Sequence, residues 1–166
     1  MCVVLIAVVA WSFGSTNSDL LAHLCLVAGL GALARASLVD IRELRLPNFW
    51  TAFALISGVA GSVVGSSGPS ALLGIIVSAV PFLLLHLLDP SALGFGDVKF
   101  AAAAGAVIAI VWWPAASVIA VVALASALVV RLVRPSGPRA FGPNLMAGTL
   151  FASLVATSLV SKGIVT

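Results

Sequence analysis

Successive apolar stretches of about membrane-spanning length are the feature that most constrains how this chain can fold. A helix needs about 20 mostly apolar residues to cross the hydrocarbon core of a bilayer, with a range of roughly 17–25. By this criterion, helices are expected weakly near residues 2–13, and at 20–39, 48–65, 70–88, 98–113, 115–133 and 144–161. The sequence therefore predicts an all-α polytopic membrane protein, a bundle of about six to seven transmembrane helices.

The amino-acid composition supports this class and argues against a nucleic-acid-binding protein. Hydrophobic residues make up 62% of the chain and charged residues 8%, whereas soluble domains have roughly 45–50% and about 25%. The formal net charge is +3, but no basic run and no interleaving of arginine with aromatic residues accompanies it. A nucleic-acid partner is therefore not expected.

The domain organisation is expected to be simple. No internal repeat or low-complexity tail divides the chain, so residues 1–166 are interpreted as a single transmembrane domain, in which residues 1–19 form a short N-terminal apolar segment and loop. The 2–13 segment lacks a charged n-region and an obvious small-residue cleavage site before Asp19. It is thus expected to be a short first membrane helix rather than a cleaved signal peptide.

The basic residues predict the orientation in the membrane, because cytoplasmic loops collect lysine and arginine. When the loops are assigned to alternating sides, seven basic residues fall at or beside one set of helix ends: Arg35, Arg42, Arg45, Lys99, Arg131, Arg134 and Arg139. Only Lys162 falls at the other set. The first set is therefore expected to face the cytoplasm, with its arginines on anionic lipid headgroups at about 1 kcal/mol each.

Two acids stand at apolar helix ends on this predicted cytoplasmic side. Asp97 lies in the hexapeptide GFGDVK, residues 94–99, and Asp40 closes the apolar run 20–39. Charged side chains at membrane depth are costly and usually functional. Two neighbouring carboxylates do not both ionise readily, so one can act as a base on water while its protonated partner donates to an amide carbonyl oxygen. This pairing predicts an aspartic peptidase site that needs no metal or other cofactor.

Each of these residues also has a purely structural interpretation. Asp97 could cap a helix that starts at Val98, and Asp40 could be an interfacial acid paired with Arg42 or Arg45. Pro47 and Asn48 are typical of a helix start, with Asn48 available as the cap. Asp89 opens a turn before Pro90, and a loop or capping role is favoured for it.

If the site is functional, the neighbouring residues have supporting roles. Gly94 and Gly96 lack a Cβ, so a substrate backbone could approach closely beside the acid. The candidate catalytic residues are Asp40 and Asp97, and the candidate substrate-binding or supporting residues are Gly94, Gly96, Lys99, Pro47, Asn48 and Asp89. His23 has no second His or Cys at ligand spacing, so no metal site is predicted.

Three segments together resemble a known family. They are DIRELRLPN at 40–48, GFGDVK at 94–99 and PRAFGPNLMAG at 138–148. In order and separation they are similar to the type IV prepilin peptidases, members of the GxGD class of intramembrane aspartyl proteases, and the resemblance covers about residues 20–166. Presenilin and signal peptide peptidase share GxGD, but their first aspartate follows a tyrosine, and this chain has no tyrosine.

The resemblance implies cleavage of a short basic leader from prepilin-like membrane proteins at the cytoplasmic membrane face. By position, it implies that Asp40 and Asp97 are the catalytic pair and that Gly94 and Gly96 are the motif glycines. The N-terminal cytoplasmic domain of the longer, bifunctional members is missing, so N-methylation is not expected. The short form is similar to the peptidases of Flp/Tad pilus systems and to the archaeal preflagellin peptidases.

Two other functions stay open on the sequence. A small ion-coupled transporter could use the two acids as a proton relay, although it would place them near mid-membrane and show inverted repeats. A non-catalytic pilus assembly factor could keep the same fold.

Overall fold

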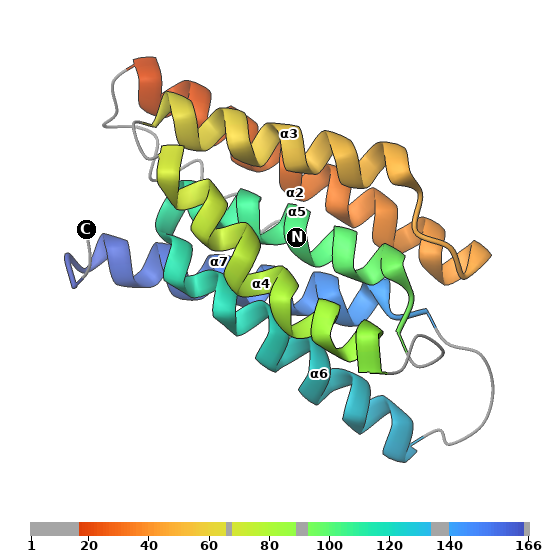
Figure 1. The fold of residues 1–166 in the computed structure, drawn as a ribbon. Coiled ribbons are helices and arrows are strands. Elements are labelled where there is room, and N and C mark those ends of the chain that lie inside the picture. Colours follow the sequence, from red (N-terminus) through yellow and green to blue (C-terminus); the bar gives the residue numbers. More distant parts are fainter. Residues whose placement is uncertain (1–16, 66–67, 89–92, 134–139, 165–166) are drawn as a thin grey trace.

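The computed structural model describes residues 17–65, 68–88, 93–133 and 140–164. The helices within these ranges are α2 (Asn17–Glu43), α3 (Asn48–Val64), α4 (Gly68–Leu88), α5 (Phe95–Trp112), α6 (Ala116–Val133) and α7 (Gly142–Ser161), with the short 3₁₀ turn η1 (Trp113–Ala115) between α5 and α6. They form the bundle shown in Figure 1. The helix predicted near residues 2–13 lies outside the described residues, as does Asp89.

The described helices confirm the predicted all-α membrane protein. Four helical stretches of the described chain are long and apolar enough to cross a membrane: Leu20–Glu43, Gly68–Leu88, Phe95–Val129 and Gly142–Ser161. The third contains η1, where the chain reverses direction (Figure 1), so α5 and α6 are separate helices of 18 residues each. Each is roughly 27 Å long. α3 is apolar but shorter, with 17 residues.

Among the helix boundaries that differ from the predicted ones, three lie at the end of the bundle that carries Asp40 and Asp97. α2 continues past Asp40 to Glu43 and ends where Leu44 takes a φ of 52°, a left-handed conformation common just after a helix. α5 begins at Phe95, before the predicted start at Val98, because the chain bends into the helix at Gly94. α7 begins at Gly142, with Pro143 in its first turn, where proline is well tolerated because its missing N–H would have no partner.

Helix α5 is the centre of the bundle (Figure 1). Eleven of its 18 residues are buried, which distinguishes it from the helices that face lipid on one side. Small residues let neighbouring helices approach it closely, as is typical of membrane proteins. At the crossing of α4 and α5, a Cβ on Gly74 would collide with the carbonyl oxygen of Gly105. Nearby, the Ser78 hydroxyl donates a hydrogen bond of 2.7 Å to the Ala101 carbonyl oxygen.

One end of this bundle gathers the segments that the sequence singled out. The C-terminal ends of α2, α4 and α6 and the N-terminal ends of α3, α5 and α7 lie together on the right of Figure 1. Arg42 is in the last turn of α2 and Lys99 is near the start of α5, whereas Lys162 follows α7 at the opposite end. Asp40 and Asp97 are therefore at the same end of the bundle.

Candidate active site

Asp40 lies in the last turn of α2 and is buried, with 5% of its surface exposed. Its Oδ2 accepts a hydrogen bond of 2.8 Å from the backbone N–H of Gly142, a residue 102 positions later in the chain. Gly142 is the first residue of α7, and the N-terminus of a helix is a favourable place for an anion. Among the described residues Asp40 thus bonds to a helix start rather than to Arg42 or Arg45, which are both exposed. The described residues show no ion pair between Asp40 and either arginine.

Asp97 is the third residue of α5 and is also buried, with 8% exposed. Its Oδ2 accepts a hydrogen bond of 3.1 Å from the N–H of Gly94, and its own N–H donates one of 3.0 Å to the Gly94 carbonyl oxygen. Asp97 therefore does cap a helix, as the structural interpretation predicts, but the helix starts at Phe95. Capping and catalysis do not exclude each other, because the backbone bond involves only one of the two carboxylate oxygens.

Leu46, in the loop between α2 and α3, packs between Gly142, which bonds to Asp40, and Gly96, which precedes Asp97. A Cβ on Gly142 would lie 3.3 Å from Leu46 Cδ2, and a Cβ on Gly96 would lie 3.3 Å from Leu46 Cβ. The loop thus packs against the start of α7 on one side and the start of α5 on the other. Through Leu46, the segments that carry Asp40 and Asp97 therefore meet at one end of the bundle.

The glycines of GFGDVK differ in their surroundings. A Cβ on Gly94 would have Asp97 Oδ2 at 3.5 Å as its nearest neighbour, which is an ordinary contact, and Gly94 is exposed. Gly96 is half-buried against Leu46. Gly94 is therefore open to an approaching backbone, while Gly96 serves packing within the protein.

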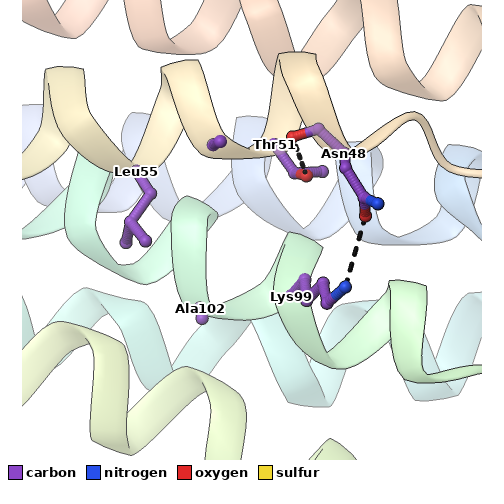
Figure 2. A pocket seen from close by; sticks show the side chains of 6 residues that line it. Asn48, Thr51, Leu55, Lys99 and Ala102 are labelled. Carbon is purple, nitrogen blue, oxygen red and sulfur yellow. Dashed lines mark hydrogen bonds between the residues drawn. The ribbon is translucent and has the colours of Figure 1, made fainter.

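Pro47 and Asn48 lie at the start of α3, and Lys99 lies near the start of α5. Asp97 and Lys99 are two positions apart on one helix, so their side chains point to different sides. Lys99 Nζ donates a hydrogen bond of 3.3 Å to Asn48 Oδ1 (Figure 2). Pro47, with an extended backbone, precedes the first residue of α3, and no side chain caps that helix. The predicted capping role of Asn48 is wrong, because its side chain bonds to Lys99 instead.

A cleft of about 300 Å³ lies between α3 and α5 at this position. Its lining, drawn in Figure 2, consists of Asn48, Thr51, Ala52, Leu55, Lys99 and Ala102. The polar residues Asn48 and Lys99 are nearest the helix starts, and the remaining lining follows the two helices into the bundle.

Two contributors to the site were not predicted. The first is Gly142, which lies within the segment 138–148; its bond to Asp40 depends on a tertiary contact that no local pattern indicates. The second is His86, near the end of α4, whose Nδ1 lies 2.7 Å from the carbonyl oxygen of Leu93. Because Leu93 immediately precedes Gly94, this bond fixes the segment that leads to Asp97.

The fold and the site define a class: a helical membrane protein with two buried carboxylates held by backbone N–H groups at one end of its bundle. The family model of the type IV leader peptidase family (Peptidase_A24) matches residues 27–130, which is more than half of the chain and includes both aspartates. The chain belongs to the type IV leader peptidase family, which confirms the predicted resemblance. No curated protein and no solved structure gives a significant match.

Proposed function

We propose that this family member is an aspartic endopeptidase that removes the short basic leader of type IV prepilin-like precursors, whether pilins, pseudopilins or Flp-type pilins. Membership of the family supports a leader peptidase in general. The observation that carries the aspartic mechanism is the placement of Asp40 and Asp97. Both are buried at the same end of the bundle, and each accepts a hydrogen bond from a backbone N–H through one of its two carboxylate oxygens.

The proposed chemistry uses the second oxygen of each carboxylate. The ionised member of the pair accepts a proton from a water molecule whose oxygen bonds to the scissile carbonyl carbon, while the protonated member donates its proton to the carbonyl oxygen. When the tetrahedral intermediate breaks down, the carbon–nitrogen bond breaks and the leaving amine nitrogen takes a proton. The Gly142 and Gly94 N–H groups keep the two carboxylates oriented throughout.

The proposed substrate lies with its apolar helix in the membrane and its leader at the cytoplasmic end of the bundle. The excess of basic residues at this end supports a cytoplasmic orientation in the cell inner membrane. Gly94, exposed beside Asp97, is the proposed point of approach for the substrate backbone. Pro47, Asn48 and Lys99 support the site by joining the start of α3 to α5.

Asp89 is proposed as an additional acidic contact for the basic leader. The argument comes from the sequence: Asp89 is a third acid on the predicted cytoplasmic side, and an acid there would attract the basic residues that precede the cleavage point. An Asp89→Asn variant should cleave a precursor with a shortened basic leader as fast as the wild type does. Full retention of the cleavage rate with the natural leader would remove Asp89 from the proposal.

Co-expression with a membrane-embedded prepilin-like precursor tests the function. We expect a size shift of the precursor, with the new N-terminus placed by sequencing just before its apolar segment. The same purified chain in liposomes should show no proton or cation flux. Flux without processing would favour the transporter alternative, and neither activity in a correctly inserted protein would favour a non-catalytic assembly factor.

A further inference from the structure

The cleft between α3 and α5 is separate from the proposed catalytic pair and has a distinct composition. Its volume is about 300 Å³, and one end is marked by the amide of Asn48 and the ammonium group of Lys99. The rest of its lining is small or apolar apart from Thr51, whose hydroxyl is already bonded to the carbonyl oxygen of Asn48 at 3.0 Å (Figure 2). The cleft is thus cationic at its mouth and apolar beyond it.

The position of this cleft in the membrane follows from the helices that form it. Asn48 and Lys99 lie at the starts of α3 and α5, at one end of the bundle. Leu55 is two helical turns further along α3, so the cleft extends about 10 Å from its mouth along the helix axis. A groove of this depth leads from the headgroup region into the hydrocarbon core, because the headgroup layers add only about 5–8 Å on each side of the core.

Lys99 has hydrogen-bonding capacity for an anion. An ammonium group carries three donors, and the bond to Asn48 Oδ1 uses one of them. Lys99 is exposed, and its Nζ also lies 5.1 Å from the ring centroid of Phe95. Asn48, which accepts from Lys99, can in turn donate through its amide nitrogen. Together the two side chains can hold phosphate oxygens at the mouth of the cleft.

We infer that this cleft binds an anionic phospholipid, with its phosphate at Lys99 and Asn48 and one acyl chain lying past Ala52, Ala102 and Leu55. The charge at the mouth is complementary to a phosphate and repels the basic leader of the proposed substrate. The small or apolar lining beyond the mouth suits an acyl chain.

The test compares lipids bound to the purified full-length chain by native mass spectrometry. Phosphatidylglycerol and phosphatidylcholine with identical acyl chains are offered in equal amounts. We expect the wild type to retain phosphatidylglycerol preferentially. In Lys99→Gln the ratio of bound phosphatidylglycerol to bound phosphatidylcholine should fall about fivefold, which is the effect of one basic residue near a membrane surface. Lys162→Gln is the matched control, because it removes an exposed lysine from the other end of the bundle; its preference should equal that of the wild type.

A second variant tests the apolar part of the cleft while keeping its charge. Ala52 is exposed and lines the cleft, so Ala52→Phe should fold normally and fill the groove. It should reduce retention of both lipids, with helicity by circular dichroism unchanged. Equal lipid preference in the wild type and Lys99→Gln would overturn the inference. So would displacement of phosphatidylglycerol by inorganic phosphate alone, or by a synthetic peptide of a precursor's apolar segment, since the cleft would then be a free-anion or substrate site. None of these outcomes depends on peptidase activity.

Discussion

The contact between Gly142 and Asp40 allows a sharp prediction about activity. A methyl group on Gly142 would lie 2.9 Å from Asp40 Oδ2 and 3.1 Å from Asp40 Cβ, where ordinary contacts begin at 3.4 Å. In a Gly142→Ala variant the Asp40 carboxylate must therefore move by about 0.5 Å. A misplacement of about 1 Å at a catalytic group can cost about 100-fold in rate, so the expected loss is about tenfold or more.

Precursor processing in cells, with the amount of inserted peptidase measured in parallel, is the appropriate assay. Overpacking of a filled site typically costs about 1–3 kcal/mol of stability, so thermal unfolding of the purified protein must be recorded too. Gly31→Ala is the matched control. It makes the same chemical change in α2, the helix that carries Asp40, but nothing lies within 4 Å of the added methyl group. This control should process at the wild-type rate.

The reasoning would be refuted if Gly142→Ala accumulated normally and processed the precursor as fast as Gly31→Ala. Such a result would mean that the Asp40 carboxylate can shift without consequence, and hence that its bond to the start of α7 does not position a catalytic group. If Gly142→Ala cleaved slowly but kept its thermal stability, the lost rate would be due to the displaced Asp40 carboxylate and not to unfolding.

Three further predictions concern the surroundings of the site. Gly94→Ala should fold with unchanged stability, since its methyl group meets only ordinary contacts, yet should raise the KM for precursor; an unchanged KM would argue against backbone approach at this residue. His86→Ala removes the 2.7 Å contact with the Leu93 carbonyl oxygen and should lower the cleavage rate severalfold, with His86→Gln partly restoring it; equal rates for all three proteins would contradict the positioning role. Ser78→Ala removes the 2.7 Å bond between α4 and α5 and should reduce stability by about 0.6 kcal/mol, read as a lower unfolding temperature at unchanged activity per folded molecule.

Most of the helices could be predicted from the sequence because their length is fixed by the bilayer. Apolar runs near 20 residues, separated by Gly, Pro and polar breakers, are sufficient to place α2 to α7 within a few residues. The errors lie at helix ends. α5 starts at Phe95 rather than Val98 because the side chain of Asp97 reaches back to the N–H of Gly94, a contact within one turn that favours an earlier start than the apolar pattern indicates.

The site is harder to predict from the sequence than the helices are, because its hydrogen bonds join segments that are far apart in the chain. Asn48 looks like a cap locally, but Lys99, 51 positions away, competes for its side-chain oxygen. Asp40 looks like the partner of the nearby arginines, but Gly142 provides the bond from the other end of the chain. Local patterns predict which residues are candidates for the chemistry, whereas the groups that orient Asp40 and Asp97 are found only in the packed bundle.

The most direct test of the account is precursor processing by Asp40→Asn, Asp97→Asn and the double variant, each normalised to the amount of protein inserted in the membrane. Asparagine keeps the shape and one hydrogen-bond acceptor but cannot accept or donate the catalytic proton. Residues that act as a unit are non-additive, so each single variant should abolish processing and the double variant should be no worse. Wild-type processing by either single variant would contradict the paired mechanism and leave that aspartate with a structural role alone.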